Sequence, residues 1–252
     1  MWVIADYQPV GLFSLKIGLA TSTGAKTLFL PTPFTIRTAL LDAAIRTRGA
    51  AVGPEMFEKL KTVSLAVRPP ERVVVTNLFT KVQKPRRADQ RSGDEEEEDE
   101  AESPGSSAMQ KTIAFREYVF LEGRFSLALS GDDPALQSVV GLLPQVNYFG
   151  KRGSFFQLLN PPKLMDVLPE GFVPLDGIYV EGSRVEGQVP RTFIPGIIQM
   201  MDDWGRSLTF DKVNVYTDRK IELGKDRVFK NVILPYRLVR SSKSFSFYER
   251  VG

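Results

Sequence analysis

A short basic segment bracketed by glycines, Gly150-Lys151-Arg152-Gly153, is the first candidate for chemistry in this sequence. Flanking glycines let backbone N–H groups approach a phosphate, while the lysine and the arginine supply positive charge. The spaced glycines and the Lys-Ser/Thr pair of a P-loop are absent, so that kind of nucleotide site is excluded. The same residues also suit a plain surface turn in which glycine meets a backbone requirement. The segment alone leaves both interpretations open.

A second group of basic residues lies at the end of one strand-like run and within the next. Its members are Lys81, Lys84, Arg86, Arg87 and Arg116. Aromatic residues interleave with this group, and aromatic side chains stack on unpaired bases: Phe79, Phe115 and Tyr118. The combination predicts a channel for nucleic acid. The alternative is a solvated charged face, with the aromatic side chains individually better explained as parts of a core.

The acidic residues indicate no metal site. A block at residues 94–100 could shield a basic groove, but its composition favours a disordered, solubilising loop. It lacks the glycine and the alternating ligands of calcium sites. The pair Asp202-Asp203 is more typical of a turn or a helix cap than of a metal centre. We therefore predict neither a metal nor a cofactor.

The chain contains no histidine and no cysteine, which excludes several classes of enzyme. Ser-His and Cys-His nucleophile pairs, histidine metal sites and disulfides all require those residues. Acid–base chemistry would have to use tyrosine, lysine or a perturbed carboxylate. No run approaches the ~20 apolar residues of a membrane span, and a signal peptide is not recognisable. We expect a cytoplasmic protein with no membrane partner.

The charge balance favours a polyanionic partner. The chain holds 33 basic and 30 acidic residues, a formal net charge of +3. Eight of the acids and none of the bases fall within residues 92–110, so the rest carries 33 basic and 22 acidic residues, or +11. A body this basic is typical of nucleic-acid-binding proteins, although other basic proteins exist.

Two strand-like runs must position the second basic group. Residues 71–82 and 111–129 are rich in Val, Ile, Thr, Phe and Tyr, which suit a pleated, half-buried surface. The segment between them is too polar to fold alone. We expect a hairpin with a long excursion that is basic at its base and disordered at its tip, and insertions of this length are often functional.

The clearest helix is predicted over residues 34–48. Apolar residues recur along one face at three- and four-residue spacing: Ile36, Leu40, Leu41, Ala44 and Ile45. Thr32 or Thr35 can cap the start of this helix, Pro33 is tolerated in its first turn, and Gly49 can end it.

The order of elements predicts an α+β fold. With strands near residues 2–7 and 62–68 and a short helix near residues 132–143, the chain alternates as strand, helix, strand, strand, helix, strand. This is the ferredoxin-like pattern. Farther on, Pro and Gly become frequent, and short β runs are predicted at residues 193–194, 207–210, 212–216, 231–239 and 244–248. We expect one domain over 1–160 and a β-rich unit over 161–252.

Several of these segments together resemble one protein family. Residues 29–43, a proline-led first helix, are similar to the CRISPR-associated RAMP proteins. Residues 77–82 and 115–120, separated by a variable insert, resemble the thumb region of the Cas-five branch of that family. Residues 148–156 resemble the glycine-basic turn of the same branch. The shared order of these loose motifs carries the resemblance, which covers the first of the two predicted domains.

The resemblance implies a ferredoxin-like (RAMP- or RRM-like) domain with a protruding thumb over about residues 78–116, an acidic disordered tip over about 90–108, and a C-terminal β-rich extension. It implies a subunit of a type I, Cascade-like effector complex. Such subunits hold the 5′ handle of the CRISPR RNA, cap a filament of backbone subunits and contact the large subunit, meeting target DNA only indirectly. The predicted RNA-binding residues are Arg37, Lys81, Lys84, Arg86, Arg87, Arg116, Tyr118, Gly150, Lys151, Arg152 and Gly153.

Three functions remain open at this point. We favour a structural RNA-binding subunit without catalytic residues. Some members of the family cut precursor RNA with Tyr, Lys and His, and the absence of His departs from that pattern. The alternative is a metal-independent endoribonuclease that uses Tyr and Lys in place of His. A third, weaker hypothesis is a basic scaffold that touches no RNA.

Overall fold

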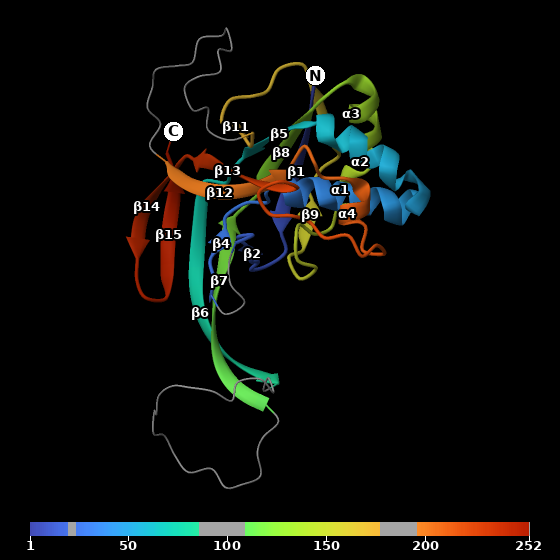
Figure 1. Cartoon of the computed structure of the whole chain (residues 1–252). Helices are drawn as coiled ribbons and strands as arrows, with labels where there is room; N and C mark the ends of the chain where they lie inside the picture. The colour runs from blue at the N-terminus through green and yellow to red at the C-terminus, as the bar shows by residue number, and fades with distance from the viewer. Residues whose placement is uncertain (20–23, 86–108, 177–195, 252) are drawn as a thin grey trace, which may run out of the picture.

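The computed structural model describes residues 1–19, 24–85, 109–176 and 196–251. It is a mixed α/β structure in which the helices lie together on one side and a long hairpin extends away from the body (Figure 1). The helical elements are α1 (Pro33–Arg48), η1 (Ala50–Val52), α2 (Gly53–Thr62), α3 (Asp133–Val140), η2 (Leu143–Gln145) and α4 (Phe210–Val213). No helix in these described ranges is both long and apolar enough to cross a membrane.

An antiparallel sheet forms the centre of the body. Its strands are β1 (Trp2–Pro9), β5 (Ser64–Arg68), β8 (Phe125–Ser130), β9 (Phe156–Leu158), β10 (Lys163–Met165) and β11 (Val173–Pro174). They follow the order β10-β1-β8-β5-β11, and β9 also pairs with β1. Every pairing in this sheet is antiparallel. Along the chain, α1 and α2 connect β1 to β5, and α3 connects β8 to β9.

Helix α1 forms as its sequence predicts. The hydroxyl of Thr32 accepts a hydrogen bond from the backbone N–H of Thr35 at 3.2 Å, which caps the helix start. Pro33 occupies the first turn, where its missing N–H costs little. At the other end, Gly49 adopts a φ of 89° and its N–H donates to the carbonyl of Ile45. The position of α1 matters because its first turn contributes to the candidate site.

The predicted hairpin is confirmed for the described residues. β6 (Arg72–Pro85) and β7 (Met109–Glu122) pair antiparallel along their whole length, from Arg72 opposite Glu122 to Pro85 opposite Met109. This hairpin belongs to a second sheet with the order β14-β15-β6-β7-β3. Its other strands are β3 (Gly24–Ala25), β14 (Tyr236–Ser241) and β15 (Phe245–Arg250). The acidic tip predicted at about 90–108 lies outside the described residues.

The C-terminal part packs closely on the first part. Two further strand pairs complete the structure: β2 (Leu15–Lys16) with β4 (Thr27–Leu28), and β12 (Ile197–Trp204) with β13 (Arg227–Leu234). Trp204 stacks on Phe57 of α2, with 4.4 Å between ring centroids. Both belong to the same cluster of buried apolar residues as the core of the central sheet. The domain boundary predicted near residue 160 remains a prediction.

Predictions of C-terminal strands were partly wrong. The runs at 231–239 and 244–248 form strands, with a break at Pro235, whereas 193–194 lies outside the described residues. The runs at 207–210 and 212–216 are not strands, because residues 210–213 form one helical turn. That turn packs Phe210 against Phe57 of α2 and lets Lys212 bind the buried carboxylate of Asp226 at 2.6 Å. Tertiary packing therefore overrides the local β pattern.

Candidate nucleic-acid interface

A pocket of about 440 Å³ opens where the start of α1, the glycine-basic turn and strand β7 meet. Five of the predicted RNA-binding residues line it: Arg116, Tyr118, Gly150, Lys151 and Gly153. The structure therefore brings together two motifs that are well separated in the sequence. Residues that were not predicted as RNA contacts complete the polar wall: Ser14, Lys16, Thr32, Thr35, Ser154, Asp202 and Arg227.

The glycine-basic turn has the geometry of an exposed, tightly closed loop. Its backbone is closed by a bond from the N–H of Ser154 to the carbonyl of Lys151 at 2.8 Å. Gly150 has a φ of 71°, and a Cβ there would lie 3.2 Å from Leu15, so glycine is required. Gly153 has open space where a Cβ would point, and Lys151 and Arg152 are exposed. A ligand can therefore approach this backbone closely.

The pocket is strongly positive. Its lining residues include four cations and one carboxylate: Lys16, Arg116, Lys151, Arg227 and Asp202. Helix α1 begins at this wall and has no acidic residue in its first turn. The N-terminal end of a helix carries partial positive charge, which adds to the field of the side chains. A phosphate-bearing ligand fits this electrostatic environment better than a neutral one.

The second basic group is divided by the hairpin. Arg116 and Tyr118 are both half-buried on β7 and share one face of it. Lys81 is exposed on β6 opposite Ile113, so the alternation of side chains places it on the other face, away from Arg116. Lys84 is opposite Gln110 farther along the hairpin, and Arg86 and Arg87 lie outside the described residues. The prediction of a single channel lined by both Lys81 and Arg116 is therefore wrong.

The hairpin exposes apolar and aromatic side chains along its outer part. Phe79 is 68% exposed and pairs with Phe115 across the strands, with 5.2 Å between ring centroids. Ile113, directly opposite Lys81, is 64% exposed. For Phe79, the expectation of a core position is therefore wrong. Phe115 is half-buried.

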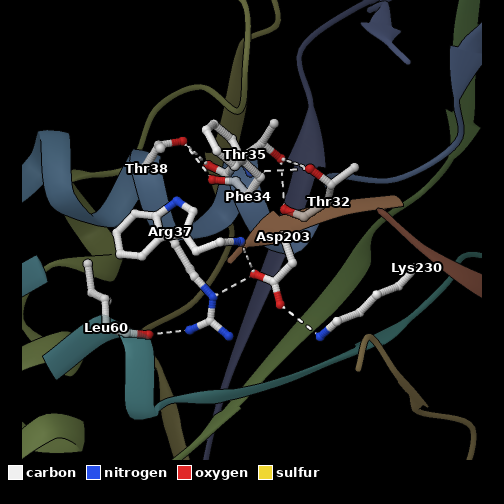
Figure 2. Close-up of polar contacts among 9 residues, drawn as sticks. Thr32, Phe34, Thr35, Arg37, Thr38, Leu60, Asp203 and Lys230 are labelled. Carbon is white, nitrogen blue, oxygen red and sulfur yellow. Dashed lines mark hydrogen bonds and ion pairs between the residues drawn. The ribbon is translucent and has the colours of Figure 1, made fainter. Parts of the chain in front are cut away.

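Arg37 does not belong to the interface. It is only 5% exposed, and its Nε donates to Asp203 at 3.0 Å. Figure 2 shows its Nη1 directed at the carbonyl of Leu60 in α2, while Lys230 reaches the other oxygen of Asp203 at 3.1 Å. The prediction that Arg37 binds RNA is wrong for this structure, because its side chain is buried and forms an ion pair with Asp203 inside the protein.

The pair Asp202-Asp203 is neither a turn nor a cap. Both residues lie in strand β12 and are almost fully buried. Successive side chains of a strand point to opposite faces. Asp202 therefore pairs with Arg227 at the pocket, whereas Asp203 pairs with Arg37 of α1 and with Lys230 on the other face. Across the described ranges, no group of three or more His, Cys, Asp or Glu residues is arranged to hold a metal.

Two cations of the pocket were missed because the sequence gives no local signal for them. Lys16 lies in β2 near the start of the chain, and Arg227 opens β13 near its end. The hydrogen-bonded pairs β2–β4 and β12–β13 carry these residues to the same pocket. An isolated Lys or Arg in a β run is normally a solvated residue, so only the tertiary structure identifies them.

Comparison with known proteins agrees with the resemblance found in the sequence. No family model matches the chain. The CRISPR-associated protein Cas5 of Archaeoglobus fulgidus is 23% identical over 239 residues, which cover 91% of this chain and 94% of that protein. The predicted resemblance to the Cas-five branch is thereby confirmed, and it extends beyond the first predicted domain into the C-terminal part.

Two solved structures also align with the chain. A CRISPR protein from Archaeoglobus fulgidus aligns with a TM-score of 0.40 and 14% identity, covering 100% of this chain and 92% of that one. A chain of a CRISPR RNA-guided surveillance complex aligns with a TM-score of 0.42 and 14% identity, covering 100% and 91%.

Proposed function

We propose that the chain is a non-catalytic, RNA-binding subunit of a type I CRISPR effector complex. The observation that carries the proposal is the positive pocket, in which Lys16, Arg116 and Arg227 lie with the glycine-basic turn that carries Lys151. The likeness to a Cas5 protein over 91% of the chain supports the same assignment. The proposed ligand is the 5′ handle of the CRISPR RNA, held mainly through phosphate contacts that fix its position.

The architecture supports a matching mechanical role. The antiparallel order β10-β1-β8-β5, with helices in both crossovers, is the order that a ferredoxin-like core requires. We propose that the β6–β7 hairpin, inserted between β5 and β8, is a thumb that contacts a backbone subunit. The exposed Phe79 and Ile113 give that hairpin an apolar surface for such a contact. In this proposal the chain caps the filament in the cytoplasm and also contacts the large subunit, with target DNA bound only indirectly.

A processing ribonuclease is the second candidate, because Tyr118 and Lys151 line the same pocket. That pair is the combination that a mechanism without histidine would need. Tyr7 and Tyr236 are poor candidates, because both are buried and burial raises the pKa of each phenol above its ordinary value near 10. We place the non-catalytic function first because the chain has no histidine, and because the carboxylate in the same pocket, Asp202, is already paired with Arg227.

Binding and cleavage can be measured in one experiment. Purified protein is titrated with labelled single-stranded CRISPR repeat RNA at several salt concentrations, with and without EDTA. We expect binding without cleavage and an affinity that falls as salt rises, because neutralised phosphates release counterions. Discrete, EDTA-resistant cleavage at one position would support the ribonuclease instead, and an affinity insensitive to salt would support the scaffold.

A matched pair of variants tests whether RNA binds at the pocket. Lys151→Ala/Arg152→Ala should weaken binding to every RNA and flatten the salt slope by up to about two units, near one per lost phosphate contact. Arg219→Ala/Lys220→Ala removes the same charge from an exposed segment that does not line the pocket. If both variants weaken binding equally, the pocket is not the RNA site. Arg152 should matter more than Lys151, because its planar fork can grip a phosphate through two hydrogen bonds.

A further inference from the structure

Arg227 differs from the other cations of the pocket, because its guanidinium is fixed on several sides. Its Nε donates to Asp202 at 2.5 Å, and its Nη2 contacts the same carboxylate. Its guanidinium carbon lies 4.5 Å from the ring centroid of Phe34, in the first turn of α1. Gly18 closes in on the same group: a Cβ there would lie 3.3 Å from both Cζ and Nη2. The side chain is nevertheless 26% exposed and lines the pocket.

These contacts decide what Arg227 can offer a ligand. Phe34 covers a face of the guanidinium, and Asp202 occupies the edge that carries Nε. Within the part of the chain that the structure describes, Nη1 has no protein partner. Asp202 is almost fully buried and neutralises the charge of the arginine. Arg227 therefore presents a rigid set of in-plane N–H donors with little net charge, which suits directed hydrogen bonds better than attraction of a phosphate.

We propose that Arg227 reads the acceptor edge of one unpaired guanine inserted into the pocket, and this inference rests on the proposed RNA-binding function. Guanine presents two neighbouring in-plane acceptors, O6 and N7, which match a planar arginine fork. Adenine replaces one of them with a donor, and the pyrimidines lack the pair. Sequence-specific RNA recognition generally uses such unpaired, splayed bases.

The rest of the pocket suits a nucleotide. Its volume of about 440 Å³ falls within the usual range for small-ligand sites. Leu12 and Tyr118 supply apolar and aromatic surface for a base, while Lys16 and Lys151 supply charge for the attached phosphate. In this arrangement the lysines determine affinity and Arg227 determines which base is accepted.

The first test leaves the protein unchanged. Wild-type protein is titrated with short uridine-rich RNAs of one length that carry a single guanine, 7-deazaguanine, adenine or no purine. We expect the guanine RNA to bind between about 5-fold and about 150-fold tighter than the adenine RNA, the range of one bidentate base contact. 7-Deazaguanine lacks only the N7 acceptor, and it should lose most of that advantage. Equal binding of guanine and 7-deazaguanine overturns the proposal.

The second test uses variants. Arg227→Lys keeps the charge and lacks the fork, so it should bind all four RNAs with similar affinity and an unchanged salt slope. Gly18→Ala should crowd the guanidinium and reduce the guanine preference, whereas Gly11→Ala, which has open space at the Cβ, should keep it. A uniform loss across the four RNAs for Arg227→Gln, with a salt slope flatter by about one unit, would identify a phosphate contact and overturn the proposal. If wild type binds none of the RNAs, the proposed function itself fails.

Discussion

Arg37 and Arg46 lie on the same helix, but their surroundings give them opposite energetic roles. Arg37 is buried and bonded to Asp203 and Leu60, whereas the Arg46 side chain is 43% exposed and pairs with Asp42 one turn away. Arg37→Ala should lower the free energy of unfolding by about 3 kcal/mol, because it leaves a buried carboxylate with less compensation. Arg46→Ala should cost less than about 1 kcal/mol, the usual limit for an exposed pair. Urea denaturation of both variants measures these differences.

A different substitution at Arg37 tests whether this residue contacts RNA. Arg37→Met retains an unbranched apolar side chain and loses the charge, so its RNA affinity at a temperature where it is folded should match wild type. A loss of RNA affinity as large as that of the Lys151/Arg152 variant, with normal stability, would restore Arg37 to the interface. The sequence could not distinguish Arg37 from Arg46, because both are arginines in one amphipathic helix. Their difference arises from Asp203, which is 166 residues away from Arg37 in the chain.

At the scale of elements, the sequence predicted correctly those helix ends and strands whose conformation depends on neighbouring residues in the chain. The cap at Thr32, the stop at Gly49 and the β-rich runs of the hairpin each depend on neighbouring residues, and each formed as expected. The prediction of strands near Phe210 was wrong, because the conformation of that segment depends on packing against Phe57 of α2. The glycine-basic turn was found from its composition, but its partner across the pocket, Arg227, was not.

Removing residues 90–108 tests the role of the acidic block between β6 and β7. Strand pairing reaches Pro85 and Met109, so the hairpin can form without the deleted residues, and loop length costs stability only slowly. The deletion removes eight carboxylates and should strengthen RNA binding by the free protein, since like charges near a basic surface oppose a polyanion. Filter binding at low salt measures the change, and unfolding curves should be nearly those of wild type.

A second variant separates charge from length in this experiment. Replacing residues 90–108 with an uncharged Gly/Ser segment of the same length keeps the loop and removes the carboxylates. If the shielding hypothesis holds, this variant should bind RNA as tightly as the deletion does. Wild-type affinity in the neutral-loop variant would show that the carboxylates have no effect on binding. Insoluble protein after deletion would instead show that the segment supports the fold.

At the scale of the whole molecule, the candidate site is built by segments from both ends of the chain. The pocket combines β2, the start of α1, β7, the glycine-basic turn and the β12–β13 pair. The ion pair between Asp203 and Arg37 and the contact of Arg227 with the Phe34 ring tie that last pair to the first helix. A composition-based charge of +11 predicted a polyanionic partner, but only the assembled fold indicates where the charge is concentrated. Long-range pairing of this kind leaves no signal in a single sequence.

The whole molecule should also have an unusually simple response to pH. Without histidine or cysteine, no side chain has an ordinary pKa near neutrality, so the free energy of unfolding should be constant between about pH 6 and about pH 9. Above about pH 10 it should fall. Burial raises the pKa of Tyr7 and of Tyr236, so the unfolded chain releases phenolic protons that the folded chain retains, and rising pH favours the unfolded state.

Urea midpoints measured across this range test the expectation, with Tyr7→Phe/Tyr236→Phe as the comparison. The double variant should be less stable at neutral pH, because the carbonyls of Leu143 and Pro70 each lose a hydrogen-bond donor at 2.7 Å. It should nevertheless lose less stability than wild type between about pH 9 and about pH 11, because the two phenols that ionise only on unfolding are gone. An alkaline slope equal to that of wild type would assign the loss to other groups, such as the lysines. A wild-type midpoint that moves between about pH 6 and about pH 9 would contradict the expectation, because it would require a titrating group with a strongly shifted pKa.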